Sequence, residues 1–498
     1  MRKWWPLVAI CLGAFMLLVD GTIVIVALPD MAADLNTSFA DLQWVLDGYA
    51  LTLAALLLGA GTLADRIGRR RLYLIGLALF ALSSLACGLA TTSGVLITAR
   101  AVQGVSAAAM FATTMALLNS VYQGRERGIA YGIWGAVNGA AAAAGPILGG
   151  LLTEHLGWRT IFLVNLPISV VAVVLARRVL PEALNPHAHR IDLPGMVTFT
   201  VAAGALTYGF ISASEHSWAS TRTLGALGLG IAGLVLFIAV ESRRRDAMLD
   251  LSLFLRSPFI GLMIAATLVN AAAFAGLVYT SLWLQSVLDL GAVGAGLTLL
   301  PLSVSAFVVA GLTGRFLHNA SPRWMIGIGM LLIGAGTALQ ALLHADSGRL
   351  VLVPGLIVAG IGVGLTMPSL ASAAMASVPP ARAGMAAGAV NTFRQLGYAL
   401  GLALLGVVFQ ARLEHFAGAA ADALSGGQAR AVIASSAPGR RGAVDHVVHA
   451  AFAGALNATA LVAAALGVLA GVLTLLLVRG ETGSEPTSQP QLDASGSR

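Results

Sequence analysis

Long apolar runs separated by short polar turns cover almost the whole chain. A helix needs about 20 mostly apolar residues to cross a bilayer, and the chain holds about 14 such runs. The expected spans are 6–28, 43–64, 72–91, 94–118, 129–153, 160–178, 194–214, 223–241, 259–284, 293–316, 324–343, 350–374, 390–411 and 451–478. The pattern therefore predicts an all-α integral membrane protein.

The composition supports a membrane location for most of the chain. Of its 498 residues, 58% are hydrophobic and 10% are charged, whereas a soluble protein carries about 25% charged residues. The net charge of +7 does not indicate nucleic-acid binding, because the arginines lie in short turns between apolar runs. There they orient the spans and contact lipid headgroups.

The distribution of Arg and Lys sets the orientation of the spans. Short loops on one side contain only Arg159, Arg222 and Arg349. The loop 412–449 on that side has further arginines, but long loops weigh little in the positive-inside rule. The other side holds Arg2, Lys3, Arg66, Arg69, Arg70, Arg71, Arg125, Arg127, Arg177, Arg178, Arg190, Arg243, Arg244, Arg245, Arg256, Arg315, Arg323, Arg382 and Arg479. Both termini are therefore expected in the cytoplasm.

A weak internal repeat suggests two halves. The pattern Gly-x-Ala-x-Gly begins at Gly128, before the fifth predicted span, and again at Gly384, before the thirteenth. These two spans hold the same position in two parallel six-span bundles if two further spans are inserted between the bundles. Parallel repeats of this kind are typical of transporters. The expected organisation is an N-terminal bundle over 1–179, inserted spans over 180–254, a C-terminal bundle over 255–480 and a disordered tail over 481–498. The outer loop 412–449 belongs to the C-terminal bundle and is expected to form a partly helical cap.

The turn from Gly61 to Arg71, G-T-L-A-D-R-I-G-R-R-R, is the sharpest local change in composition. Its arginines place it at the cytoplasmic surface. Gly61 would permit close helix approach, and Gly68 a backbone turn that other residues hinder. Asp65 can accept hydrogen bonds from a neighbouring helix N-terminus or arginine. The hypothesis is a latch that holds the cytoplasmic side shut.

Three ionisable residues lie inside predicted spans, where charge is costly and usually functional. At a rise of ~1.5 Å per residue, Asp20 lies roughly 12 Å, Asp47 roughly 6 Å and Arg100 roughly 9 Å from the outer ends of their spans. Pairing between them is geometrically possible. One interpretation is a carboxylate that exchanges a proton for substrate in a central cavity. The other is a structural ion pair, and for Asp47 the proximity of the headgroups leaves the two equally open.

Two further features allow both a functional and a structural interpretation. Gly135 and Gly139 form a small-xxx-small face, and Pro146 before Gly149 and Gly150 removes a backbone hydrogen bond and should bend that helix. This is either a kink at a moving interface or a packing seam. Arg394, near the cytoplasmic end of its span, is explained as well by snorkelling as by function.

Several classes of protein are disfavoured. There is no G-x-x-x-x-G-K-[ST] motif for an ATPase, no cofactor motif and no metal-ligand cluster. Cys11 and Cys87 lie in apolar runs, and we interpret them as small residues packed in the interior. A membrane sensor or enzyme would need a soluble or catalytic module, and no segment is long enough for one.

Six motifs follow one another along nearly the whole chain. They are L-V-D-G-T-I-V-I-V-A-L-P (Leu18–Pro29), the turn with Gly61, Asp65, Arg66, Gly68 and Arg69, I-T-A-R-A-V-Q-G-V-S-A-A (Ile97–Ala108), G-P-I-L-G-G (Gly145–Gly150), W-R-T-I-F-L-V-N-L-P (Trp158–Pro167) and N-T-F-R-Q-L-G (Asn391–Gly397). In sequence and in order, these motifs resemble those of the Major Facilitator Superfamily, and within it those of the fourteen-spanner drug:proton antiporters.

The resemblance implies export of drugs, antibiotics or other amphipathic or cationic molecules, driven by the proton gradient without a cofactor. Proton coupling or substrate binding would fall to Asp20, Asp47, Arg100 and Gln103, the gate to Asp65 and Arg69, and C-terminal contributions to Asn391 and Arg394. The expected setting is a monomer in the bacterial cytoplasmic membrane, with lipid, protons and a small-molecule substrate as its partners. A carrier for one metabolite, such as an amino acid, a siderophore or a self-made antibiotic, and an uptake carrier are the alternatives.

Overall fold

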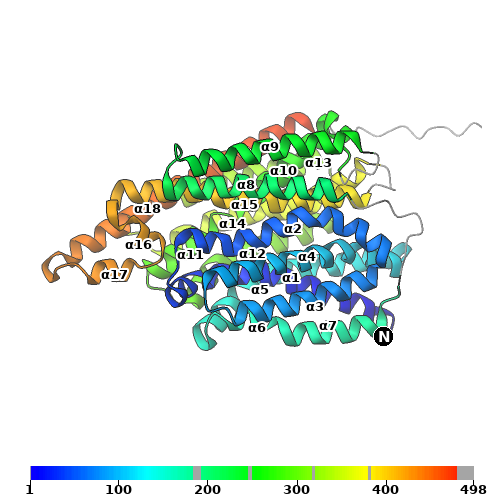
Figure 1. The fold of residues 1–498 in the computed structure, drawn as a ribbon, viewed down its shortest axis with the longest axis horizontal. Helices are drawn as coiled ribbons and strands as arrows, with labels where there is room; N and C mark the ends of the chain where they lie inside the picture. The colour runs from blue at the N-terminus through cyan, green and yellow to red at the C-terminus, as the bar shows by residue number, and fades with distance from the viewer. Residues whose placement is uncertain (1, 183–191, 245–248, 317–319, 379–382, 479–498) are drawn as a thin grey trace, which may run out of the picture.

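The chain folds into a bundle of long helices whose axes are roughly parallel or antiparallel to one another (Figure 1). The structure is a computed structural model that describes residues 2–182, 192–244, 249–316, 320–378 and 383–478. Within these ranges every regular element is helical. The all-α membrane fold expected from the sequence is confirmed.

The helices follow one another with short connections. They are α1 (Trp5–Leu35), α2 (Phe39–Ile67), α3 (Arg69–Gly88), α4 (Ser93–Val121), α5 (Gly124–Leu156), α6 (Thr160–Leu163), α7 (Asn165–Val179), α8 (Leu193–His216), α9 (Thr221–Arg243), α10 (Ser257–Ala273), α11 (Leu277–Ser286), α12 (Ala292–Phe316), α13 (Pro322–Gln340), α14 (Leu352–Ala376), α15 (Ala383–Ala417), α16 (Ala421–Ser425), α17 (Ala429–Ala434) and α18 (Arg441–Leu477).

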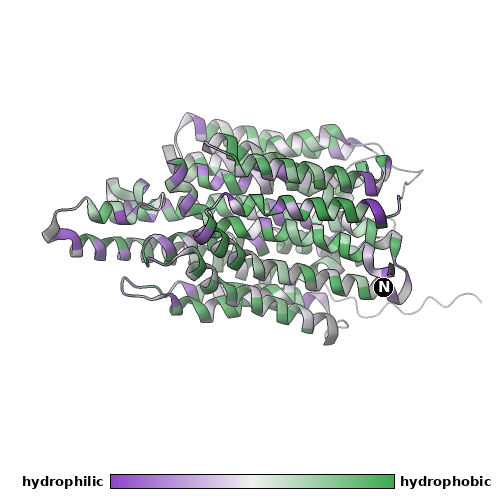
Figure 2. Cartoon of the chain, turned by 90° about the horizontal axis from the view of Figure 1, so that it is seen from below, coloured by the Kyte–Doolittle hydropathy of each residue, from purple (hydrophilic) through white to green (hydrophobic). Residues whose placement is uncertain are grey.

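The described residues hold twelve candidate membrane spans, where the sequence predicted about 14. Twelve helical stretches there are long and apolar enough to cross a membrane, with α6–α7 and α10–α11 each forming one stretch. The long helices α2 and α5, which are not among the twelve, run beside them through the bundle (Figure 1). The count of about 14 therefore stands as an approximate one. Apolar residues cover the helix bodies, and polar residues gather toward the helix ends (Figure 2).

Several predicted boundaries differ from the structure. The span at 160–178 is interrupted at Val164, and the span at 259–284 is interrupted between Ala273 and Leu277. Three helices run well beyond the apolar runs that predicted them: α1 continues to Leu35, α15 covers residues from Ala383 to Ala417, and α18 begins at Arg441. Hydropathy marks only the part of a helix that lies in lipid, whereas the backbone hydrogen bonds continue into the polar residues beyond.

Two groups of helices face each other across the molecule. Helices α1 to α7 pack among themselves, as do α10 to α15 with α18, and the groups meet where α5 lies on α12, α2 on α15 and α1 on α11. Helices α8 and α9 pair with each other, and α8 also packs on both α2 and α15 (Figure 1). The domain limits given by the sequence remain a prediction.

One end of the molecule extends beyond the rest. The last turns of α15, the short helices α16 and α17, and the first turns of α18 project as a helical extension (Figure 1, left). This extension covers 412–449, for which a partly helical segment was predicted, and its helical part is confirmed. Gln410 Nε2 donates to Asp422 Oδ1 at 2.7 Å, and Arg430 pairs with Asp289. The predicted disordered tail, 481–498, lies outside the described residues.

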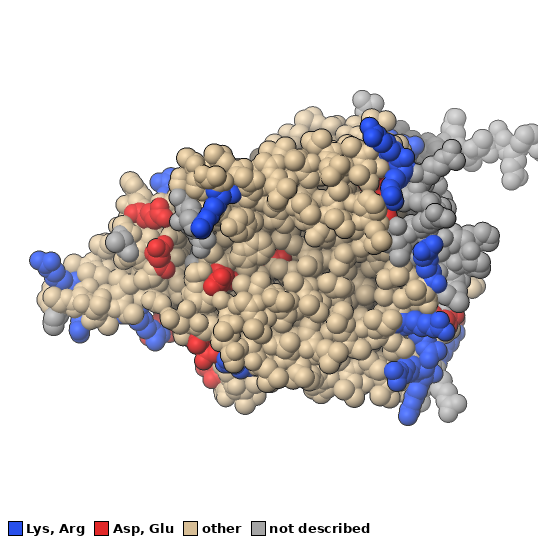
Figure 3. Space-filling model, in the orientation of Figure 1, with Lys and Arg blue, Asp and Glu red and all other residues tan. Residues whose placement is uncertain are grey.

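Charge is concentrated at the two ends of the molecule. The face in Figure 3 shows a broad uncharged belt, with Lys and Arg clustered at the end where the chain begins and most of the acidic side chains toward the other. An uncharged belt between charged ends is the surface that a bilayer requires.

Candidate functional site

The site centres on Asp20, which lies midway along α1 and is fully buried. Its Oδ2 accepts a hydrogen bond from Arg100 Nη1 at 2.6 Å. Its Oδ1 accepts from Gln103 Nε2 at 3.0 Å and from Asn165 Nδ2 at 3.1 Å. Because α1 ends seven residues later than expected, Asp20 lies about 22 Å from the end of its helix at ~1.5 Å per residue, and the predicted 12 Å is its distance to the end of the apolar run.

Arg100, on α4, is held from several directions. It is 1% exposed, and beside Asp20 its Nη1 donates to Gln103 Oε1 at 2.7 Å while its Nε donates to the carbonyl of Val45 at 3.0 Å. The guanidinium lies over the ring of Tyr49, 4.3 Å from the centroid. Only the planar fork of an arginine can donate in these directions and stack on a ring at once.

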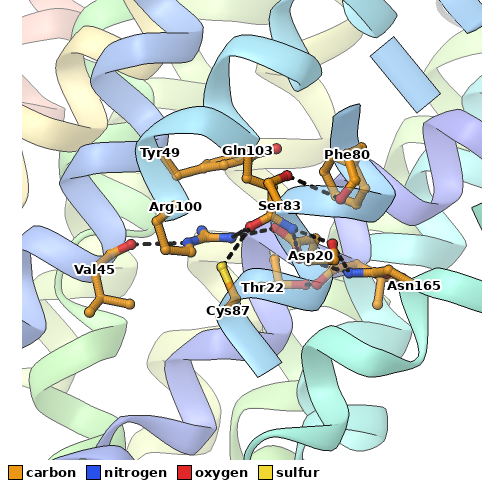
Figure 4. A network of polar contacts seen from close by, with 12 residues as sticks. Asp20, Thr22, Val45, Tyr49, Phe80, Ser83, Cys87, Arg100, Gln103 and Asn165 are labelled. Atoms are coloured by element: carbon orange, nitrogen blue, oxygen red, sulfur yellow. Dashed lines mark hydrogen bonds and ion pairs between the residues drawn. The ribbon is translucent and has the colours of Figure 1, made fainter. Parts of the chain in front are cut away.

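Three neutral polar groups complete the network (Figure 4). Gln103 Nε2 also donates to Ser84 Oγ at 2.8 Å, and Asn165 Nδ2 lies 3.4 Å from the same oxygen. The thiol of Cys87, buried as predicted, lies 3.9 Å from Gln103 Oε1. The sequence analysis did not single out Asn165 or Ser84. An amide within the apolar run of W-R-T-I-F-L-V-N-L-P was the signal for Asn165.

Every member of this network belongs to the first group of helices. The residues come from α1, α2, α3, α4 and α7, and none comes from α10 to α18. The predicted pairing of Asp20 with Arg100 is therefore seen, and Gln103 joins it. Taking two charges out of water costs several kcal/mol each unless additional hydrogen bonds compensate. Here the amides and hydroxyl supply those bonds.

Asp47 does not join the network. It lies on α2 with 0% exposure, and neither carboxylate oxygen has a hydrogen-bond partner. Asp47 lies eight residues after Phe39, the first residue of α2, which is about 12 Å along the helix at ~1.5 Å per residue. The helix start at Phe39 does not set the membrane boundary, so the position of Asp47 near the headgroups stays a prediction, whereas its complete burial between helices is observed.

Arg394 lies deep in α15, eleven residues from its start at Ala383 and about 17 Å along it at ~1.5 Å per residue. Its Nη1 donates to Asn391 Oδ1 at 3.2 Å, and its Nε is buried without a partner. Asn391 lies one turn nearer the start of α15 than Arg394, so this bond fits both snorkelling and a functional role, and the two interpretations of Arg394 stay open. The two C-terminal candidates, Asn391 and Arg394, are therefore in contact with each other.

The turn between α2 and α3 is built around Gly68. Its φ of +108° lies in the region that favours glycine, which agrees with the predicted backbone turn. Glu182, which the sequence analysis did not single out, lies against it: Arg70 N–H donates to Glu182 Oε1 at 3.2 Å, and Arg71 Nε lies 3.7 Å from Oε2.

The other residues of this turn give a mixed outcome. Arg69 Nη1 donates to the carbonyl of Ala116 at 3.4 Å, whereas Arg66 is exposed at the end of α2. A side chain at Gly61 would meet no atom within 4 Å. The close helix approach predicted there is therefore wrong for this arrangement of the helices. The side chain of Asp65 lies outside the described part of the chain.

The glycine motif of α5 faces two different helices. A Cβ on Gly145 would overlap Thr22 Oγ1, and one on Gly149 would lie 2.6 Å from the carbonyl of Ile23, both on α1. A Cβ on Gly150 would instead lie 2.6 Å from the carbonyl of Ala292 on α12. Helix α5 continues through Pro146 to Leu156. The surroundings of Gly135 and Gly139 lie outside the described residues.

The two groups of helices are in contact toward the end that carries α16 and α17. Glu154 Oε2, on α5, accepts from the backbone N–H of Val293, in the first turn of α12, at 3.1 Å. Gln285 Nε2, on α11, donates to the carbonyl of Val26 at 2.9 Å, and Gln43 Nε2 donates to Tyr279 Oη at 3.1 Å. These bonds hold the helix groups together at the side assigned to the exterior.

A membrane bundle of two helix groups that meet along several helices is the arrangement expected of a secondary transporter. The comparison with protein families agrees, because the model of the Major Facilitator Superfamily matches residues 10–402. The chain belongs to the Major Facilitator Superfamily. It is a transporter and not an enzyme.

Relatives with assigned roles carry names from drug resistance. The chain is 38% identical to the multidrug resistance protein Stp of Mycobacterium tuberculosis, over 82% of this chain and 76% of that protein. It is 32% identical to the tetracenomycin C resistance and export protein of Streptomyces glaucescens, over 96% and 92%. It is 37% identical to the puromycin resistance protein pur8 of Streptomyces alboniger, over 82% of each.

Solved structures show the same fold. The crystal structure of the human organic anion transporter MFSD10 (TETRAN) matches 95% of this chain and 99% of its own with a TM-score of 0.62 at 14% identity. A bacterial homologue of the human lysosomal transporter Spinster, in an inward-facing and unoccupied conformation, matches 96% and 97% with a TM-score of 0.64 at 16% identity. At such identities the likeness concerns the fold alone.

Proposed function

We propose that this protein is a proton-coupled antiporter that exports drugs or antibiotics across the bacterial cytoplasmic membrane. The relatives named for multidrug, tetracenomycin C and puromycin resistance support the substrate class. The observation that carries the coupling is the fully buried Asp20, whose carboxylate is bonded to Arg100, Gln103 and Asn165. When a carboxylate in this position takes up or releases a proton, the groups that are bonded to it must change their hydrogen bonds at the same time.

The coupling follows from the charge balance of the network. Ionised Asp20 neutralises Arg100, and the amides of Gln103 and Asn165 donate to the other carboxylate oxygen of Asp20. A proton on Asp20 removes that neutralisation and leaves a buried, uncompensated guanidinium, a state that costs several kcal/mol. Protonation therefore favours a rearrangement of the helices that gives Arg100 water or another anion. Export would be driven by proton entry from outside, with no cofactor.

The proposed orientation follows the positive-inside rule. Both termini lie in the cytoplasm, and the α16–α17 extension lies outside. The protein acts as a monomer in contact with lipid, protons and a small-molecule substrate. The turn around Gly68, where Glu182 contacts the start of α3, belongs to the cytoplasmic gate, and Asp65 and Arg69 are its proposed latch.

The test is Asp20→Asn in everted membrane vesicles with an acidified lumen. The substrate is first found with a growth-inhibition panel in a pump-deficient host. We expect substrate accumulation driven by the pH gradient to be lost, because the amide cannot take up a proton. Asp34→Asn is the matched control, since Asp34 lies on the same helix but is exposed and pairs with Arg159. Normal accumulation by the Asp20→Asn variant at wild-type protein levels would refute the coupling role.

Export of a single self-made antibiotic is the second candidate. It is favoured by the match along 96% of this chain to a protein named for resistance to and export of one antibiotic. The same growth panel separates the two: protection against one compound supports a dedicated exporter, and protection against several unrelated compounds supports a multidrug exporter.

A further inference from the structure

A groove lies between α3 and α4, which pack against each other and are both candidate membrane spans. Its volume is about 690 Å³, and ligand pockets usually measure about 300–1,000 Å³. Leu82 and Val95 in its walls are 65% and 49% exposed, whereas Ser83 and Ala99 at its floor are 3% and 7% exposed. The groove therefore forms where small residues lie between larger ones at the meeting of two helices.

The groove opens toward the bilayer. On α3 the exposed residues Ala78, Leu82 and Ala86 recur at four-residue spacing, and on α4 the exposed residues Val95 and Val102 are seven positions apart. Residues at these spacings share one face of a helix, and on a membrane span an exposed face meets lipid. All of them except Ala78 also line the groove. The groove is therefore continuous with the surface through which the protein contacts the membrane.

The surface of the groove is apolar. None of the described residues that line it is charged. Ser83 Oγ and Thr98 Oγ1 each donate to the carbonyl four residues earlier at 2.8 Å, and Thr92 Oγ1 accepts from the N–H of Val95 at 3.4 Å. Hydroxyls that bond to their own backbone in this way need no further partner. The groove therefore suits a hydrocarbon occupant and gives a polar ligand little to bond.

The length of the groove matches half of a bilayer. On α4 it runs from Thr92, next to the helix start, to Val102, ten residues further on, which is about 15 Å at ~1.5 Å per residue. The hydrocarbon core of a bilayer is about 30 Å thick, so one leaflet is about 15 Å deep. The connection from α3 to α4 lies on the side assigned to the exterior. An acyl chain of the outer leaflet therefore has the direction and depth that the groove requires.

The floor of the groove borders the network around the buried carboxylate. Ser83 and Ala99 directly precede Ser84 and Arg100 in the chain. Ser84 Oγ accepts from Gln103 Nε2 at 2.8 Å, and this bond joins α3 to α4. A void beside packed helices removes dispersion contacts from the atoms that line it. A filled groove therefore supports the separation of α3 and α4 that this bond needs.

We propose that the groove binds one acyl chain of an outer-leaflet phospholipid, which holds α3 against α4 beside the bond between Ser84 and Gln103. A chain in the groove contacts both helices, whereas a chain on a single exposed helix face has protein atoms on one side only. The lipid in the groove therefore exchanges more slowly than the lipid around it. This inference concerns the lipid partner and does not depend on the compound that the protein exports.

The first test locates the lipid on the wild-type protein. The full-length protein is reconstituted in vesicles of phosphatidylethanolamine and phosphatidylglycerol that contain a small fraction of phospholipid with a diazirine midway along one acyl chain. After illumination, labelled peptides are quantified by mass spectrometry. We expect several-fold more label on residues 79–102 than on residues 231–238 of α9. There Ile231, Val235 and Ile238 are as exposed as the groove walls but do not line the groove.

The second test removes the site. Ala86→Phe places a ring in the groove, and Ala78→Phe is the matched control, because Ala78 is an exposed alanine of the same helix that does not line the groove. Native mass spectrometry of protein purified in detergent should show one phospholipid retained by wild type and by Ala78→Phe, and none by Ala86→Phe. Ala86→Leu, a smaller change, should retain an intermediate amount.

The third test measures the effect of the lipid on α3 and α4. A ligand that binds the folded protein raises its thermal stability, and it slows local opening where it binds. Adding phosphatidylglycerol to delipidated wild type should therefore raise Tm and slow amide hydrogen exchange in residues 79–88. Both effects should be smaller in Ala86→Phe than in Ala78→Phe.

Three results would contradict this assignment. Labelling of residues 79–102 no higher than that of residues 231–238, or equal retention of lipid by Ala86→Phe and Ala78→Phe, would overturn the lipid site. A second copy of the chain in the mass spectrum, in place of the lipid, would assign the groove to an oligomer instead. Hydrogen exchange in residues 79–88 that does not change when lipid is added would overturn the role of the lipid in holding α3 against α4.

Discussion

At the scale of single residues, the contacts of Arg100 matter more than its charge. It joins Asp20, Gln103 and the carbonyl of Val45 with one planar group and lies over Tyr49. A hydrogen bond to a charged group contributes about 1.5–3 kcal/mol. Loss of any one of these bonds therefore changes the balance between the paired and unpaired states by about tenfold or more.

Arg100→Lys tests whether geometry or charge is required. Lysine keeps the positive charge but is a point donor on a flexible stem, so it cannot reach all of these acceptors. We expect at least about tenfold slower proton-driven export, measured as initial rates in everted vesicles across a range of pH. Arg159→Lys is the control, because Arg159 pairs with Asp34 at the exposed end of α1. Export within twofold of wild type in Arg100→Lys would show that charge alone suffices.

The residue scale is also where the sequence was most and least informative. Charge inside apolar runs identified Asp20 and Arg100, and the motif Ile97–Ala108 that contains Arg100 added Gln103. Hydropathy did not identify Asn165 or Ser84, because a single amide or hydroxyl hardly changes the mean of a window. Nor did it distinguish the environments of Asp20 and Asp47. That difference depends on which side of α2 faces the second helix group, and this is a property of the packing.

At the scale of elements, α5 connects the two helix groups. Gly145 and Gly149 allow it to lie close to α1, within its own group, while Gly150 and Pro146 face α12. Gly145 and Gly149 serve the packing of one group, as a packing seam requires. Gly150 and Pro146 lie where the groups meet, and their role at a moving interface stays a prediction.

Gly150→Leu should separate the groups without unfolding either. Overpacking costs about 1–3 kcal/mol, enough to shift a two-state population by about tenfold. We expect slower export and several-fold faster labelling of Ser286→Cys from outside by an impermeant maleimide, since Ser286 is buried at the end of α11. The native Cys11 and Cys87 are both buried and give little background.

Gly94→Leu is the control for this change. A side chain at Gly94, near the start of α4, would meet no atom within 4 Å. Gly94→Leu combined with Ser286→Cys should match Ser286→Cys alone in its export rate and in its labelling rate. Unchanged labelling in Gly150→Leu would mean that the contact with α12 does not hold the outer side closed.

At the scale of the whole molecule, α8 and α9, the two helices predicted to be inserted, have a defined place. Helix α8 lies along the line where α2 meets α15: Ala203 packs with Ala50 and Ala399, and Ile211 packs with Ala40 and Ala403. The sequence predicted that two spans are inserted between the bundles, because the repeat is offset. It could not show where they pack, since hydropathy carries no information about neighbours far apart in the chain.

The buried position of Asp20 has an electrical consequence. If Asp20 carries one proton inward in each cycle, export of a neutral compound moves one net charge, worth about 2.3 kcal/mol per 100 mV, whereas export of a monovalent cation moves none. Collapsing the potential with valinomycin and potassium, at constant pH gradient, should therefore slow the export of neutral compounds and leave the export of monovalent cations unchanged. Equal slowing of both would show that more than one proton moves in each cycle. The number of protons that this one carboxylate carries thus decides which compounds can draw on voltage as well as on acidity.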